Sequence, residues 1–327
     1  MKKLQTIDVY LIPLPIVAIA ATILRTVALL TGFNSSSMHY DNKIAFVIST
    51  VIVAVSSLAF LSYLLLGDKD RPLIARSDNA ASYIPAGIVS TALLFMGVEN
   101  ITMAFGGYPR GIVGILSLVT GVLALASIVS FFLSVFIEKR NNLYKAAFSL
   151  CIVLFLAVYA ALLYFNKAEH PTNSPNRLID QLAYLLSAIF FLYEARIPLG
   201  RAKWRGYVAF GLCATLMAVY SSVPALIYCF VSGDLVSESL IESILTLTMA
   251  IYIASKVVQI KSLTPDSKCD TAKSIEILAS MREDEMKAQH TPVACDTDNM
   301  EENDDTEDAS NYSFDIPDAE EGEGVDA

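Results

Sequence analysis

Residues 11–30 read LIPLPIVAIAATILRTVALL, an apolar run in which Arg25 is the only charged side chain. About 20 residues of α-helix cross the hydrocarbon core of a bilayer, because each residue adds roughly 1.5 Å to a thickness of about 30 Å. The stretch therefore predicts a membrane-spanning helix. An arginine inside such a helix is costly unless it is paired, hydrated or able to reach the interface, so the contacts of Arg25 become the central question.

The composition of the whole chain agrees with a membrane protein. Hydrophobic residues make up 54% of its 327 residues and charged residues only 17%, whereas a soluble domain has about a quarter of its residues charged. Since a backbone in lipid must satisfy its own hydrogen bonds, continuous apolar runs without alternation predict helices and not barrel strands. We therefore expect an all-α, polytopic helical bundle. Its eight predicted spans are Val9–Leu30, Ile44–Leu66, Pro85–Phe105, Ile112–Ile137, Ala146–Phe165, Leu178–Tyr193, Tyr207–Val231 and Leu235–Ile260.

The sixth span is the weakest of the eight, because it is short and opens with Asp180 and Gln181. Charge in the connections favours keeping it. With eight spans, 12 Lys and Arg residues fall on the side that holds both termini and 4 on the other side. The positive-inside rule then predicts cytoplasmic termini in a plasma (inner) membrane. The first apolar stretch is longer than a signal peptide needs, so we expect an uncleaved span there.

Charge is distributed unevenly between the bundle and the C-terminus. Residues 262–327 contain 20 acidic and 4 basic residues, a net charge of −16, while residues 1–261 sum to +6. We expect a transmembrane domain over 1–261 and a juxtamembrane segment over 262–288, whose apolar spacing permits a short amphipathic helix. Residues 289–327 have no Lys or Arg and few apolar side chains, which predicts a disordered acidic cytoplasmic tail. A basic protein partner for this tail is what the alternative scaffold hypothesis expects.

Three charged side chains are predicted at similar depth below the same, outer, surface. Arg25, Glu99 and Glu242 lie five to seven residues from the outer ends of their spans, roughly 7–10 Å at the helical rise, and Asn100 follows Glu99. Such a group favours an outward-facing polar site for a small molecule or an ion. The alternative is that Arg25 reaches the headgroups and the two carboxylates join helices structurally. The sequence leaves both readings open.

The seventh span adds Tyr220, Ser221 and Pro224 to the candidate ligand-binding residues. A proline inside a helix has no N–H, so it frees a backbone carbonyl at membrane depth, and nearby hydroxyls can line a path or satisfy the backbone. Proline kinks also occur for packing alone, and that alternative stays open as well.

Enzymatic signatures are absent from the sequence. It contains no GxSxG, no phosphate-binding loop, no HExxH and no dinucleotide fingerprint. Its three histidines lie far apart, and there is no CxxC pair. We therefore expect no catalytic residue, metal ligand or cofactor, no nucleic-acid partner and no enzyme; a membrane-embedded enzyme is the least favoured reading. Two functions remain: transport or sensing of a small molecule or ion, and a non-catalytic membrane anchor or scaffold that acts through its acidic tail.

Overall fold

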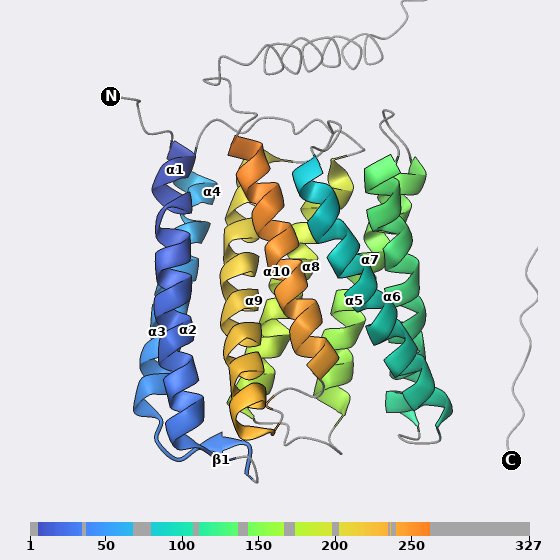
Figure 1. Cartoon of the computed structure of the whole chain (residues 1–327). Helices are drawn as coiled ribbons and strands as arrows, with labels where there is room; N and C mark the ends of the chain where they lie inside the picture. The colour runs from blue at the N-terminus through green and yellow to red at the C-terminus, as the bar shows by residue number, and fades with distance from the viewer. Residues whose placement is uncertain are drawn as a thin grey trace, which may run out of the picture. The chain divides into compact units, whose positions relative to one another are not determined.

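The computed structural model describes residues 6–34, 37–67, 80–106, 111–136, 143–166, 174–197, 203–234, 236 and 240–261. These ranges form ten helices and one two-stranded hairpin (Figure 1). The expected juxtamembrane segment and acidic tail lie outside the described residues. The helices are α1 (Thr6–Leu11), α2 (Pro13–Gly32), α3 (Ile44–Leu61), α4 (Tyr63–Leu66), α5 (Ala80–Phe105), α6 (Ile112–Phe136), α7 (Leu143–Phe165), α8 (Pro175–Arg196), α9 (Trp204–Ser232) and α10 (Leu240–Lys261), and the strands are β1 (Phe33–Asn34) and β2 (His39–Tyr40).

Eight segments of the described chain are long and apolar enough to cross a membrane. The pairs α1–α2 and α3–α4 each form one of these segments, and the other helices form one each. The expected all-α, multi-pass bundle is thus confirmed, and the chain is a multi-pass membrane protein. The doubtful sixth span is confirmed as α8, which extends beyond the predicted range at both ends. It begins at Pro175, whose fixed φ suits the first helical position, after the extended residue Ser174.

The helices pack as a closed sequence of six with a helical hairpin added at one side. Helices α5, α6, α7, α8, α9 and α10 each pack against the next, and α10 returns to α5. Helices α2 and α3 pack against each other and both contact α9 (Figure 1). Helix α9 consequently touches α2, α3, α8 and α10, and it is the most deeply buried of the eight spans.

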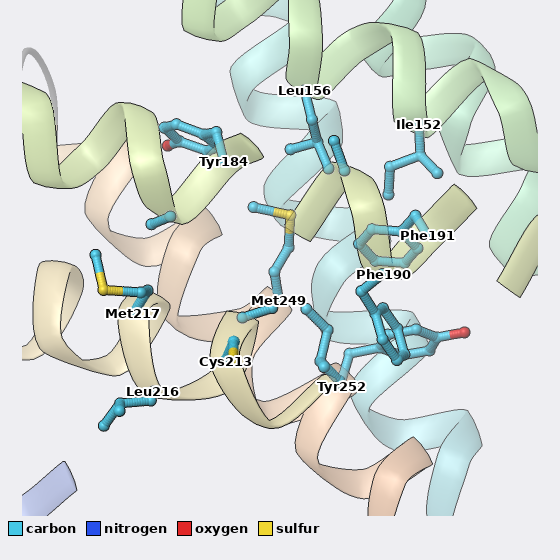
Figure 2. Packing of buried hydrophobic residues seen from close by; sticks show 14 of the residues in the cluster. Ile152, Leu156, Tyr184, Phe190, Phe191, Cys213, Leu216, Met217, Met249 and Tyr252 are labelled. Carbon is cyan, nitrogen blue, oxygen red and sulfur yellow. The ribbon is translucent and has the colours of Figure 1, made fainter. Parts of the chain in front are cut away.

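Apolar side chains fill the space between α7, α8, α9 and α10 (Figure 2). Two glycines of α9 permit the close approach of its neighbours. A Cβ on Gly206 would lie 2.4 Å from the Tyr193 ring of α8, and a Cβ on Gly211 would lie 2.4 Å from Val257 Cγ2 of α10. The contact between α8, α9 and α10 therefore depends on the missing side chains at these two positions.

A hairpin that the sequence did not predict joins α2 to α3. Phe33 of β1 pairs with Tyr40 of β2, and Met38 before β2 has a positive φ of 55°. Aromatic rings hold the hairpin against the bundle: the Phe33 ring lies 5.5 Å from that of Tyr228 on α9, and the Tyr40 ring stacks at 4.3 Å on Phe46 of α3. This packing directs Tyr40 into the interior.

The start of α10 differs from the prediction. The predicted span included Val236, which the structure shows in a bend, and the described part of α10 runs from Leu240, with Glu242 in its first turn. A carboxylate in the first turn of a helix is stabilised by the partial positive charge of that terminus, which gives a physical reason for this position.

Candidate functional site

Arg25 is directed into the protein and not toward the membrane surface. Its side chain is 0% exposed. The guanidinium donates hydrogen bonds from Nη2 to Asn176 Oδ1 at 3.0 Å, and from Nη1 to the backbone carbonyl of Ser221 at 3.2 Å and to that of Tyr220. Its Cζ also lies 4.8 Å from the centroid of the Tyr220 ring. The alternative in which Arg25 reaches the headgroups is therefore not the one that the structure adopts.

Pro224 explains why a carbonyl of α9 is open to Arg25. In a regular helix the carbonyl of residue 220 accepts the N–H of residue 224, but proline has none. Helix α9 continues through Pro224 to Ser232, and Arg25 donates to the Tyr220 carbonyl in place of the missing helical donor. An arginine of one span thus completes the hydrogen bonding of another.

Asn176 connects Arg25 to the hairpin. Its Oδ1 accepts hydrogen bonds from Arg25 and, at 2.6 Å, from the Tyr40 hydroxyl. Burial is the main cause that raises the pKa of Tyr40 above 10.0, so this hydroxyl is a neutral donor at physiological pH. The Tyr220 hydroxyl is 2.9 Å from Ser49 Oγ of α3, which fixes the ring beneath the guanidinium.

Asp180 brings a carboxylate to the same place. It lies four residues after Asn176 on α8, hence on the same helical face. The Ser221 hydroxyl donates a hydrogen bond to Asp180 Oδ1, and the Asp180 carboxylate interacts electrostatically with Arg25. We call the group formed by these side chains the Arg25 cluster. Its members are Arg25, Tyr40, Asn176, Asp180, Tyr220 and Ser221, all of them buried.

The polar contacts continue from the cluster toward α10. Tyr184, four residues beyond Asp180, has its hydroxyl 2.9 Å from Thr246 Oγ1. It also interacts electrostatically with the carboxylates of Glu242 and Asp180. Through Tyr184 the cluster therefore extends to a second buried carboxylate, so that one arginine and two acidic residues belong to one region.

The structure unites part of the predicted set and separates the rest. Tyr220 and Ser221 accept hydrogen bonds from Arg25 through their carbonyls, Pro224 lies on the same helix, and Tyr184 links Glu242 to this region. Asn100 belongs to the contact between α5 and α6, where it donates to Met96 O at 2.9 Å and accepts from Ser117 at 3.5 Å. Its neighbour Glu99 is half-buried on α5, which packs against α6 and α10. The carboxylate that accompanies Arg25 is thus Asp180, in place of Glu99.

Four residues of this region were not predicted from the sequence: Tyr40, Asn176, Asp180 and Tyr184. Asp180 carried a signal, since an ionisable residue inside a span indicates a functional site, but its place at the start of the shortest apolar run made it resemble a span boundary. Tyr40 and Asn176 lie next to connections, where polar residues are ordinary, and nothing in their spacing indicates a contact.

Metal-binding groups are not found in the described part of the chain, where no three His, Cys, Asp or Glu side chains are arranged to hold an ion. The Arg25 cluster instead contains a guanidinium and a side-chain amide as donors, three hydroxyl groups and a carboxylate. Fold and site define a multi-pass α-helical membrane protein with charged groups buried between its spans. No protein-family model, curated protein or solved structure matches this chain.

Proposed function

We propose that the protein transports or senses a small polar solute or ion, which binds at the Arg25 cluster. The observation that carries this proposal is the complete burial of Arg25 beside Asp180, within helices that are apolar enough to span a membrane. Placing an arginine or an aspartate at mid-bilayer costs about 2.5–3.5 kcal/mol on insertion scales. Well-packed apolar residues often stabilise a protein as much as buried charged groups do. A function therefore explains these buried charges better than stability does.

Unsatisfied donors indicate the chemistry of the solute. Arg25 Nε and Asn176 Nδ2 are buried and have no hydrogen-bond partner among the described residues. Buried donors in native proteins are normally paired, so exceptions call for a bound water or ligand. Both donors match an acceptor oxygen, and a guanidinium binds carboxylates in particular through two parallel bonds. A small solute that carries a carboxylate is the class that we propose.

The position of the cluster supports an extracellular entry. Tyr40 belongs to the connection between the first two spans, and this connection lies on the side of the bundle that has few Lys and Arg residues. The positive-inside rule assigns that side to the exterior. A plasma membrane location with both termini in the cytoplasm is part of this proposal.

Binding and uptake by the purified protein test it. The melting temperature in nanodiscs is measured with a panel of short-chain carboxylates, amino acids and inorganic anions, and stabilising solutes are followed into proteoliposomes. We expect Arg25→Lys and Asn176→Ala to weaken binding by about tenfold or more, because each removes one of the two buried donors that have no partner among the described residues. Arg205→Lys is the matched control, because Arg205 donates to Leu64 O at the opposite end of the bundle. Unchanged binding in both site variants would contradict the proposal.

A second candidate function rests on the charge of the C-terminus. A net charge of −16 in residues 262–327 favours a scaffold that recruits a basic cytoplasmic protein. Deletion of residues 289–327 separates the two candidates: solute uptake persists without the tail if the bundle is the functional part, whereas a scaffold loses its partner and keeps a folded bundle.

A further inference from the structure

One face of α8 carries polar side chains through most of the membrane. Asp180, Tyr184, Ser187 and Glu194 are separated by four, three and seven residues, a spacing that keeps them on one side of a helix. We call these four residues the α8 stripe. They extend over fourteen residues, roughly 21 Å at the helical rise, within a hydrocarbon core of about 30 Å.

Titratable groups of α10 face both ends of the stripe. At one end Tyr184 interacts with Glu242, and Asp180 interacts with Arg25. At the other end Glu194 Oε1 accepts a hydrogen bond of 2.6 Å from the Tyr252 hydroxyl. The buried Lys256 Nζ lies 5.5 Å from the Tyr252 ring centroid. Each end thus combines a carboxylate, a phenol and a cationic side chain.

The middle of the α8 stripe contains a buried hydroxyl that makes no hydrogen bond to the described residues. Ser187 is 1% exposed, and its Oγ has no hydrogen-bond partner among the described residues. Serines in membrane helices commonly donate to a carbonyl one turn earlier, as Ser90 does to Ala86, Ser127 to Leu123 and Ser222 to Ala218.

A second such hydroxyl belongs to the facing helix. Thr215 Oγ1 of α9 is also buried without a partner among the described residues. On α9, Ser221 contacts Asp180 of α8 and Gly211 approaches Phe190 of α8. Thr215 lies between the two α9 residues, and Ser187 lies between the two α8 residues. Both hydroxyls therefore occur at the level between the two polar ends. Buried hydroxyls without protein partners are where ordered water binds.

We propose that protons cross the bundle along the α8 stripe, with water bound at Ser187 and Thr215 as the bridge between its two polar ends. The inference rests on the proposed function and names the coupling ion of the same site. At each step a hydroxyl or water accepts a proton on a lone pair as it releases its own to the next group, so the step balances without a further reactant.

Apolar packing makes this a gated path and not an open pore. Between the levels of Tyr184 and Tyr252, Met249 of α10 and Phe191 of α8 belong to the packed core (Figure 2). A water chain forms only when these side chains separate, which ties proton passage to a change of conformation. Such coupling is what a transporter driven by a proton gradient requires.

Proton uptake by reconstituted protein tests the inference. Liposomes that contain a trapped pH-sensitive dye receive a potassium diffusion potential, and the rate of internal acidification is measured. We expect the wild-type protein to exceed protein-free liposomes, and Ser187→Ala and Tyr252→Phe to slow acidification by about tenfold or more, since each removes one relay group. Ser127→Ala and Tyr228→Phe are the matched controls, because both residues are buried but lie outside the stripe, and they should conduct as the wild type does.

Radiolytic hydroxyl labelling provides a readout that needs no driving gradient. Met249 is fully buried, so its oxidation in the folded protein requires bound water nearby. We expect labelling in the wild type and less in Ser187→Ala. An unlabelled Met249, or acidification that is equal in the wild type, Ser187→Ala and protein-free liposomes, overturns the proton path. Solute binding that still depends on Arg25 under those circumstances leaves the proposed function standing, whereas binding insensitive to Arg25→Lys refutes that function itself.

Discussion

Arg25 serves as the hydrogen-bond donor for three acceptors on two other spans. The planar guanidinium reaches an amide oxygen of α8 and two consecutive carbonyls of α9. A lysine ammonium has a single donor point and cannot reproduce that fork. The identity of this side chain, and not its charge alone, therefore determines how α2, α8 and α9 are joined.

Removal of the guanidinium should be strongly destabilising. Arg25→Ala leaves the Tyr220 carbonyl buried without a donor and the Asp180 carboxylate buried without its nearby positive charge, and losing one member of a buried charged group costs about 3–5 kcal/mol. Arg25→Lys should cost less, because the charge remains. Unfolding by denaturing detergent gives the free energies. Arg196→Ala, on an exposed arginine, should stay within about 0.5 kcal/mol; equal losses at both positions would show that Arg25 has no special role.

Tyr40 gives the fold a dependence on alkaline pH. Tyr40→Phe removes one hydrogen bond to Asn176, which should cost about 0.5–1.5 kcal/mol. Because burial raises the pKa of Tyr40 above 10.0, the unfolded chain ionises first, and stability falls as the pH rises above that value. Melting temperatures between pH 7 and 11 should fall less steeply for Tyr40→Phe than for the wild type. The exposed Tyr164 provides the control, and a slope unaffected by Tyr40→Phe would refute the assignment.

Only part of the site was predictable at the residue scale. Arg25 and Pro224 break local rules, one as a charge in an apolar run and the other as a proline in a helix, and such violations are visible in a sequence. Tyr40 and Asn176 break no rule where they stand. Their contribution arises from contacts between segments more than a hundred residues apart, which one sequence does not reveal.

At the scale of helices, α2 and α9 share one incomplete hydrogen-bond ladder. Since Pro224 leaves the Tyr220 carbonyl without its helical donor and Arg25 fills that role, the two residues should be energetically coupled. Pro224→Ala restores a backbone N–H that can pair with the same carbonyl. The loss caused by Arg25→Ala should therefore be smaller in a Pro224→Ala background.

A double-mutant cycle measures this coupling. We expect the interaction free energy between the two substitutions to be about 0.5–3 kcal/mol, the range found for residues that share a partner. Pro85, a proline inside α5, gives the matched control: Pro85→Ala should combine additively with Arg25→Ala. Additivity at Pro224 as well would mean that the arginine does not replace the missing helical bond.

Close approach between α9 and α10 depends on Gly211. Its added Cβ would lie 2.4 Å from Val257 and 3.2 Å from Phe190, so Gly211→Ala should destabilise the bundle by about 1–3 kcal/mol through overpacking. Gly87 of α5 has no atom within 4 Å of such a Cβ. Gly87→Ala should be neutral or stabilising by up to about 1 kcal/mol, because alanine is the better helix former. Detergent unfolding of both variants provides the comparison, and the reverse order would contradict the described packing.

Helix existence was predictable from apolar length, but helix ends were not in every case. The apolar run that includes Leu235 predicts a helix through Val236, where the structure shows a bend, because hydropathy does not register where backbone hydrogen bonding begins. The predicted α8 was too short for the opposite reason. Its polar first turn, with Asn176 and Arg177, resembles a connection in the sequence although both residues are helical and buried. In both helices, the polar residues next to the wrongly predicted end lie in or near the candidate site.

At the scale of the molecule, the α2–α3 hairpin adds to a body of six helices mainly through α9. Sequence patterns indicate which segments cross the membrane and how the charges alternate, but they do not give the order of helices around the bundle. That order separates Glu99 from Arg25 and brings Asp180 to it. The position of a charged residue along its helix therefore indicates which end of the bundle it is near, but it does not indicate which side chain it contacts.

The proposed membrane orientation can be measured at two exposed positions. Ser37 lies in the β1–β2 connection and Lys203 at the opposite end of the bundle, just before α9 (Figure 1). Because Lys and Arg residues concentrate in the connections on the Lys203 side, the positive-inside rule predicts that this side faces the cytoplasm. In a background without the five native cysteines, a membrane-impermeant maleimide should label Ser37→Cys on intact cells and Lys203→Cys only after permeabilisation. The reverse pattern would move the entrance of the Arg25 cluster to the cytoplasm, and labelling of both positions on intact cells would contradict an odd number of spans between them.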